Sequence, residues 1–108
     1  LDEKRSIKIL RQIKQNDPNS LAIVIWVLDK LISTSLMAKK SSSPKGYLEN
    51  TKMWNSKIGS YLSFIKKMEP NLLNLSKDIF EIEKTFKGIK KLDTWKEVER
   101  LIIRICAS

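Results

Sequence analysis

The sequence predicts an all-α fold: a compact bundle of about five helices, formed by one domain over residues 1–108. Apolar residues recur at spacings of three and four along most of the chain, which is the pattern of helices with one buried face. The chain has only 3 Gly and 3 Pro, so its helices should be long. Hydrophobic residues make up 42% of the chain, which is enough for one packed core in a domain of this size.

The first helix is predicted to run to about residue 16, with Asp2 as its cap and a stripe formed by Ile7, Leu10 and Ile13. The segment NDPNS at 16–20 is the predicted turn, because Pro18 disfavours helical geometry in the residue before it and suits the first position of a new helix. Asp17 or Ser20 is expected to cap that helix.

The second helix is predicted over 18–40. Its run AIVIWV has high strand propensity, so a buried strand is the alternative. Length favours a helix, because one helical stripe continues from residue 21 to residue 36: Leu21, Val24, Leu28, Leu31, Ile32 and Leu36. Trp26 adds apolar surface on another face, so we expect a central helix with Trp26 in the core. The apolar run LAIVIWVL is shorter than the roughly 20 residues of a membrane span, so no transmembrane segment is expected.

The segment SSSPKG at 41–46 is the clearest predicted loop, and Ser43 before Pro44 is a candidate phosphorylation site. A third helix is predicted over 47–69, with Gly59 in close contact with another helix at a cost of ~1 kcal/mol relative to Ala. Its predicted buried stripe is Trp54, Ile58, Tyr61, Leu62, Ile65 and Met68.

A fourth helix is predicted to begin at Pro70 and to end at Gly88 or Leu92. Its predicted buried face is Leu72, Leu75, Ile79, Ile82, Phe86 and Ile89. The fifth helix is predicted to open with a capping box formed by Thr94 and Glu97, in which each side chain bonds the other residue's backbone amide. Its apolar positions are Val98, Leu101, Ile102 and Ile105.

Several kinds of catalytic chemistry lack their residues here. The chain has no His, 1 Cys and no glycine-rich phosphate loop, so the common general base, zinc sites and nucleotide cradles are missing. We therefore expect a protein that is not an enzyme and needs no cofactor or metal. The lone Cys106 is typical of a reducing compartment, so an intracellular location, nuclear or cytoplasmic, is expected.

The net charge of +9 favours acidic partners: a protein or peptide, or nucleic acid. Of the 21 basic residues 17 are Lys, and they are spread evenly over both halves of the chain. Such a distribution is also that of a well-solvated surface, since no block of like charge stands out.

The stretch KGIKKLDTWKE at 87–97 is the strongest candidate for a binding site. Lys87, Lys90 and Lys91 share one helix face, because residues three and four apart are neighbours. Together with Trp95 and the free amides of the next helix they suit an acidic-hydrophobic peptide. The alternative is structural: the lysines stabilise a helix C-terminus, Glu83 pairs with Lys87, and Trp95 staples the turn.

Residues 72–105, LLNLSKDIFEIEKTFKGIKKLDTWKEVERLIIRI, resemble the later helices of a known family of helical bundles. This family comprises the N-terminal domain of the transcription elongation factor TFIIS and, more closely similar, the integrase-binding domain of the chromatin protein LEDGF. The shared features are EKT at 83–85, the Lys-rich KGIKKL, a short loop and a final apolar helix. The chain departs from the family in the helix at 47–69 and in lacking a late tryptophan.

The resemblance implies a bundle of four or five helices that binds short acidic-hydrophobic motifs in transcription or chromatin. It places the ligand at the loops 16–19 and 91–94, with Asp17 as the acidic loop residue. The predicted partner-binding residues are therefore Asp17, Lys87, Lys90, Lys91 and Trp95.

Two alternative functions stay open. One is a helical domain that binds nucleic acid through its general positive charge. The other rests on a second resemblance: the chain is similar in length, charge and apolar content to bacteriocin-immunity proteins, small basic four-helix proteins of the cytosol that act by protein contact near the membrane. No motif is shared with them, and the sequence does not predict an oligomeric state.

Overall fold

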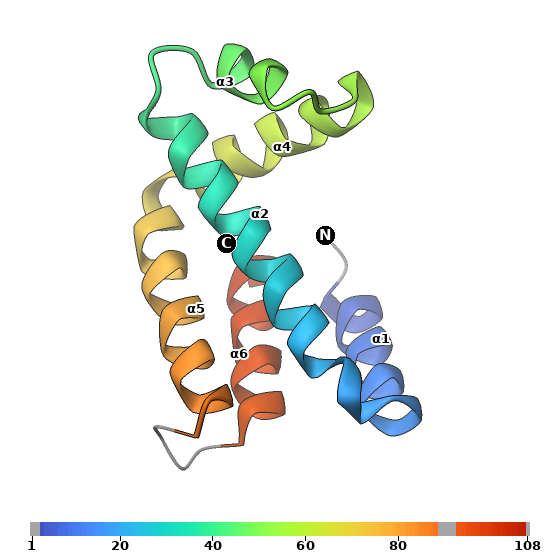
Figure 1. Ribbon diagram of the computed structural model, residues 1–108. Coiled ribbons are helices and arrows are strands. Elements are labelled where there is room, and N and C mark those ends of the chain that lie inside the picture. Colours follow the sequence, from blue (N-terminus) through green and yellow to red (C-terminus); the bar gives the residue numbers. More distant parts are fainter. Residues whose placement is uncertain (1–2, 89–92, 108) are drawn as a thin grey trace.

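The computed structural model describes residues 3–88 and 93–107. Within these ranges the chain forms six α-helices and two 3-10 helices, and no strand. In order they are α1 (Glu3–Asn16), η1 (Pro18–Ser20), α2 (Leu21–Lys40), α3 (Pro44–Asn50), α4 (Asn55–Met68), η2 (Glu69–Asn71), α5 (Leu72–Phe86) and α6 (Thr94–Ala107) (Figure 1). Five of the α-helices have 14 to 20 residues and α3 has seven. The predicted all-α bundle of about five helices is therefore confirmed.

The long helix α2 organises the bundle. Its contact with α5 is the most extensive between described helices, α6 packs on α5, and α1 packs on α6. Figure 1 shows α2 running from the corner beside α1 to the opposite end of the molecule, where α3 and α4 lie. The core between them consists of aliphatic side chains and Tyr61, with Ile32, Leu48, Met68, Leu72, Leu75 and Val98 fully buried.

The β-branched run in α2 is helical, as its length predicts. Of the predicted stripe, Leu21 and Ile32 are buried, whereas Val24, Leu28, Leu31 and Leu36 are only partly covered. The buried face is therefore rotated in part from the stripe, because Ile25, Ser35 and Ala38 are buried instead. Together with η1 the helix spans Pro18–Lys40. By length and composition this segment is long and apolar enough to cross a membrane, which the eight-residue run did not suggest.

The helix predicted over 47–69 is two helices, and the predicted loop 41–46 is shorter than expected. Helix α3 begins at Pro44, where the Ser43 hydroxyl accepts a bond from the Gly46 amide at 3.1 Å. It ends where Thr51 Oγ1 bonds the Leu48 carbonyl at 2.6 Å and Lys52 takes a left-handed φ of 60°. A hydroxyl that bonds a nearby carbonyl competes with helix continuation, which explains the break before α4.

Two predicted core tryptophans are on the surface. Trp26 is 60% exposed, because it lies off the α2 face that carries Ile25 and Ile32. Trp54 is 81% exposed, because it precedes α4 instead of lying inside a longer helix. Gly59 has open space around it, with no atom within 4 Å of an added Cβ, so the predicted close helix contact there is also wrong.

We predict that Trp26→Ala changes the free energy of unfolding by less than about 1 kcal/mol, as is usual for an exposed side chain. Ile32→Ala, in the same helix, should cost roughly 2–5 kcal/mol, because Ile32 is fully buried and its removal leaves a cavity. Urea unfolding of both variants measures the difference. A larger loss for Trp26→Ala than for Ile32→Ala would show that the helix is rotated from its described position.

Candidate functional site

The predicted docking edge lies at one end of the bundle. Lys90 and Lys91 fall outside the described residues. Of the other predicted residues, Lys87 directly follows α5, Trp95 is in the first turn of α6, and Asp17 lies between α1 and η1. Figure 1 shows the α1–α2 corner and the start of α6 at the same end of the molecule. The fold thus brings the three described residues to one end.

The first turn of α6 is capped by a side chain of the preceding loop. Asp93 Oδ1 accepts hydrogen bonds from the amides of Trp95 at 3.1 Å and Lys96 at 3.4 Å. The cap is therefore Asp93 and not the predicted Thr94 of a capping box, and Glu97 instead pairs with Arg100 at 2.8 Å. Trp95 is half-buried and packs against the core. The amides and the ring expected to receive a ligand thus already have partners within the chain.

Lys87 and Gly88 end α5. The Lys87 amide donates to the Glu83 carbonyl at 3.0 Å, and Gly88 has a φ of 81°, a conformation that favours glycine at a helix C-terminus. This confirms Gly88 as the end of the fourth predicted helix. Burial and the charge of Asp29 raise the pKa of Glu83, and the Lys87 charge, placed as the spacing predicts, opposes that rise. Lys87 therefore has a structural role at the end of α5.

Glu83 lies beside a second carboxyl, that of Asp29 in α2. Burial raises the pKa of Glu83 above its ordinary value of 4.5, and the charge of Asp29 and a hydrogen bond between the two carboxyl groups raise it further, whereas Lys87 opposes the shift. A hydrogen bond between carboxyl groups requires a proton on one of them. Asp29 also accepts a bond from Ser33 Oγ at 3.1 Å. The α2–α5 contact therefore places Glu83, whose pKa is raised, beside the carboxyl of Asp29.

Asp17 is held by its own turn. Ser20 Oγ donates to Asp17 Oδ2 at 2.5 Å, and neither side chain bonds the backbone amides as a cap. The Asp17 carboxylate is exposed and lies at the predicted ligand-binding end. The hydrogen bond to Ser20 gives Asp17 a structural role in this turn, so no ligand is needed to account for the residue.

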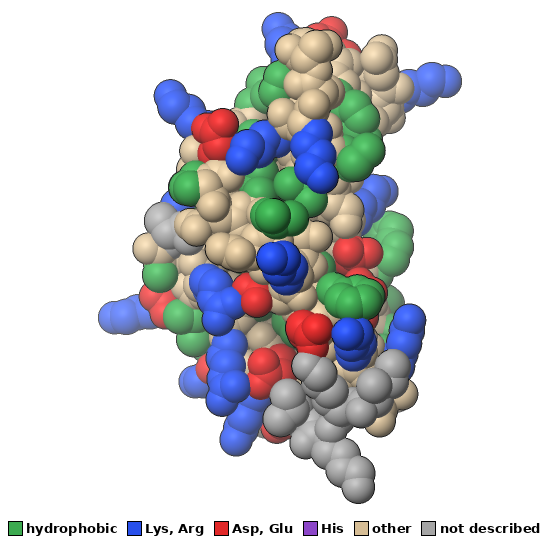
Figure 2. Space-filling model, turned by 90° about the vertical axis from the view of Figure 1, so that its left-hand side faces the viewer, with side chains coloured by type: hydrophobic (Ala, Val, Ile, Leu, Met, Phe, Trp, Pro, Cys, Tyr) green, Lys and Arg blue, Asp and Glu red, His purple; other side chains and the backbone are tan. Residues whose placement is uncertain are grey.

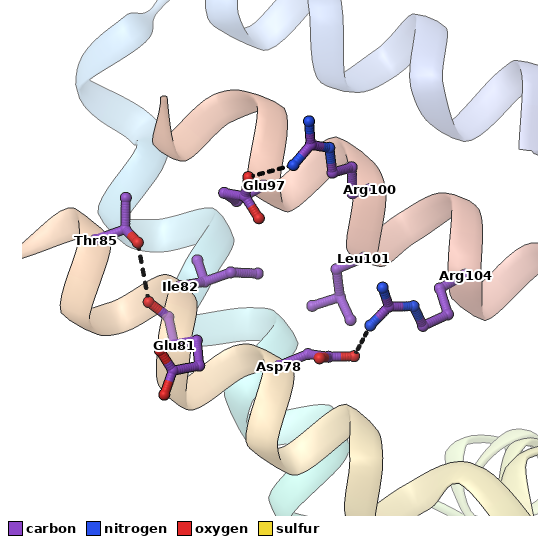
Figure 3. Close-up of a pocket in the computed structure, with 8 residues that line it drawn as sticks. All are labelled: Asp78, Glu81, Ile82, Thr85, Glu97, Arg100, Leu101 and Arg104. Atoms are coloured by element: carbon purple, nitrogen blue, oxygen red, sulfur yellow. Dashed lines mark hydrogen bonds and ion pairs between the residues drawn. The ribbon is translucent and has the colours of Figure 1, made fainter. Parts of the chain in front are cut away.

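A polar hollow of about 200 Å³ lies between α5 and α6 (Figure 3). In Figure 3, Arg104 reaches across to Asp78, and Arg100 pairs with Glu97 along α6. Thr85 Oγ1 donates to the Glu81 carbonyl at 3.1 Å. The Arg104–Asp78 pair joins α6 to α5, whereas Arg100–Glu97 lies within α6 and Lys84–Glu81 within α5. Among the described residues no three of His, Cys, Asp or Glu are grouped to hold a metal ion.

A larger groove lies between α2 and α4. We call it the α2–α4 groove; it has a volume of about 560 Å³ and is lined by Leu31, Lys57, Ser60, Tyr61, Ser63, Phe64 and Lys67. Tyr61 is buried, which raises the pKa of its hydroxyl, and a hydrogen bond to the Thr34 side chain opposes that shift. No acidic residue is in the lining, and within 3–88 and 93–107 neither Lys57 nor Lys67 has an ion-pair partner. The groove therefore combines an apolar wall with uncompensated positive charge.

Around α5, and between α1 and α6, positively charged side chains are mixed with acidic ones. Figure 2 shows the side of the molecule around α5, where Lys and Arg side chains alternate with hydrophobic and acidic ones and form no continuous basic patch. The hollow lined by α1 and α6 likewise contains Glu3 and Glu99 beside its Lys and Arg residues, and Glu99 pairs with Arg11 at 2.7 Å. The α2–α4 groove differs from these hollows because its lining contains Lys residues and no acidic residue, and the adjoining hollow beside Trp54, lined by Lys30, Lys52 and Lys57, shares that property.

Two groove residues could have been noticed in the sequence, but the predicted helical stripes drew attention away from them. Phe64 is a large apolar residue off the predicted stripe of its helix, and Leu31 was assigned to a buried face. The groove exists because α4 crosses α2 near its C-terminal end and leaves part of the α2 flank uncovered (Figure 1). A crossing of this kind depends on the break before α4, which the sequence analysis did not predict.

Comparisons with protein-family models, with curated proteins and with solved structures gave no match for this chain. The resemblances to the TFIIS and LEDGF domains and to bacteriocin-immunity proteins therefore stay predictions.

The acid pair gives a pH-dependent prediction. Because the folded-state pKa of Glu83 is above its unfolded value, the pair favours folding below pH 4.5, and that contribution is lost as the pH rises through the folded-state pKa. Glu83→Gln should therefore unfold at higher urea than the parent at neutral pH, and this advantage should shrink toward pH 4.5.

Asp29→Asn is the matched control, because it removes the same repulsion from the other side. The double variant should gain less than the two single variants together, since only one repulsion exists to be removed. Fully additive gains, or an advantage of Glu83→Gln that is independent of pH, would contradict the pairing.

Proposed function

We propose that the chain is a protein-interaction module that binds a short acidic-hydrophobic segment of a partner in the α2–α4 groove. The observation that carries this proposal is the lining of the groove: Leu31, Tyr61 and Phe64 beside Lys57 and Lys67, with no acidic residue. The partner class is the one predicted from the sequence, but the docking surface differs from the predicted edge at 87–97.

The apolar part of the groove supports a hydrophobic contact. Phe64 and Leu31 are partly covered although they pack against the core, so each retains apolar surface for a ligand. A volume of about 560 Å³ suits one or two large side chains, which is how an amphipathic helix anchors itself in a groove. Removing that surface from water supplies the affinity, at roughly 25 cal/mol per Å² before the costs of ordering.

The charged part of the groove determines that the bound segment should carry negative charge. Lys57 and Lys67 are exposed and flank the aromatic wall. Carboxylates on a bound segment can pair with them without displacing an existing ion pair. Such contacts contribute mainly to orientation and to the rate of association, and they weaken with salt.

The predicted edge is less well suited to this role. The first amides of α6 bond Asp93, Trp95 packs on the core, and Lys87 compensates Glu83. Involvement in transcription or chromatin, and a nuclear or cytoplasmic location, are proposals that rest on the resemblance to the TFIIS and LEDGF domains and on the lone Cys106.

The test uses a short fluorescent peptide with Leu and Phe on one helical face and Glu on the other. Its binding is followed by fluorescence anisotropy, and a peptide with Gln in place of Glu is the control. Lys57→Glu with Lys67→Glu should weaken binding at least about tenfold, which corresponds to ~1.4 kcal/mol. Phe64→Ala should weaken binding without any change of charge, and the Gln peptide should bind poorly.

Lys90→Glu with Lys91→Glu makes the same charge change at the predicted edge and is the matched comparison. It should alter affinity by no more than about twofold, a small fraction of the groove effect. A loss confined to this second double variant would place the site at 87–97. Equal losses in both would mean that the peptide responds only to the net charge of the chain.

A further inference from the structure

A second exposed surface lies next to the groove. We call it the tryptophan face: Ile23, Trp26, Val27 and Lys30 of α2, with Trp54 before α4. The apolar residues of this face are exposed: Ile23 to 64%, Trp26 to 60%, Val27 to 51% and Trp54 to 81%. Lys30 links the two rings: its Nζ lies 5.1 Å from the centre of the Trp26 ring, and it lines the same hollow as Trp54 and Lys52.

The helix that carries most of this face is unusually apolar for its degree of burial. The segment Pro18–Lys40 has a stretch of mean hydropathy 1.8, of which 22% is buried inside the bundle. The central helix of a bundle is normally covered on most sides. Ile25, Ile32, Ser35 and Ala38 are buried within the chain, so crossing a bilayer would require the helix to leave the bundle. The exposed side of α2 can therefore contact an external surface, such as a membrane, while the bundle stays intact.

We propose that the tryptophan face rests on the surface of an anionic lipid bilayer, with α2 parallel to the membrane plane. Tryptophan is enriched at the level of the headgroups, and helices that lie in the interface combine aromatic and aliphatic residues with Lys or Arg. In this position Trp26 and Trp54 sit among the headgroups, Ile23 and Val27 contact the outer acyl region, and Lys30 and Lys52 approach lipid phosphates.

Charge favours a bilayer over a second copy of the chain. The chain has a net charge of +9, so a symmetric dimer through this face would bring two equally charged molecules together. In a contact between two α2 helices, Lys30 of each copy would also lie within the shared apolar surface. An anionic membrane instead attracts the same charge, because each Lys or Arg near its surface interacts favourably with the negative lipid headgroups.

This proposal is independent of the proposed function. The tryptophan face and the α2–α4 groove share no residue by definition, although Lys57 and Tyr61 line both adjoining hollows. Phe64→Ala alters only the groove, and Trp26→Ala alters only the face. Either proposal can therefore fail while the other stands.

The experiment measures co-sedimentation of the protein with vesicles of equal parts phosphatidylcholine and phosphatidylglycerol. Binding should be absent from pure phosphatidylcholine vesicles. Trp26→Ala and Trp54→Ala should each lower the partition coefficient by about tenfold, because each removes a ring that anchors the face. Phe64→Ala should leave vesicle binding unchanged, and circular dichroism checks that each variant is folded.

Tryptophan fluorescence locates the contact in the same sample. In a Trp95→Phe background, emission comes only from Trp26 and Trp54, since the chain has 3 Trp. Binding should shift that emission to shorter wavelength, and brominated lipid should quench it. In the unmodified protein, loss of quenching in the Trp26→Ala and Trp54→Ala variants gives the same information if the background variant does not fold.

Three results would overturn the proposal. The first is the absence of binding to anionic vesicles even at low salt. The second is binding that is equal in the parent and both tryptophan variants without quenching, which would reflect net charge alone. The third is a dimer that Trp26→Ala dissociates, with no vesicle binding, which would assign the face to a second copy.

Discussion

The packing of α2 against α5 is the contact on which the arrangement of the other helices depends. It buries the side of α2 that carries Ile25 and Ile32 against a helix whose own apolar face, from Leu72 to Ile82, is almost completely covered. Helix α5 then supports α6, and α6 supports α1, with Arg104–Asp78 and Arg11–Glu99 ion pairs across these two contacts. A bundle built in this order covers the side of α2 that carries Ile25 and Ile32 and leaves Ile23, Trp26 and Val27 exposed.

Both proposed surfaces follow from that uncovered side. Helix α4 crosses α2 at one end and forms the groove with Leu31, whereas Ile23, Trp26 and Val27 lie exposed on the other flank of α2. In the hollow at each surface, apolar side chains and lysines lie together and the lining contains no acidic residue, whereas an ion pair joins α5 to α6. The excess positive charge of the chain is thus uncompensated where the apolar surface is also exposed, which is the combination that suits acidic amphipathic segments and anionic membranes.

The helical periodicity was sufficient to predict the fold class, the long helix over 18–40 and most of the core, because a buried face repeats at fixed spacing. It failed where position depends on a turn or on tertiary packing. Trp54 fits the stripe of a continuous helix, but Thr51 and Lys52 break that helix and expose the ring. Trp26 is apolar whether or not a neighbour covers it, so its exposure could not be read from the sequence. At 87–97 the sequence showed a group of lysines beside Trp95. It did not show that Asp93 caps α6 or that Glu83 lies beside Asp29, because both depend on the folded geometry.

The central claim is that α2 has a buried and an exposed apolar side, and cysteine accessibility tests it most directly. In a Cys106→Ser background, Ile23→Cys, Val27→Cys, Ile25→Cys and Ile32→Cys are each treated with a thiol reagent under native conditions. The account predicts fast modification at positions 23 and 27, and slow modification at 25 and 32 that becomes fast only on unfolding. Protection at all four positions would mean that a part of the chain covers the tryptophan face. Rapid modification at all four would mean that α2 is not packed against α5, and either result would contradict the account.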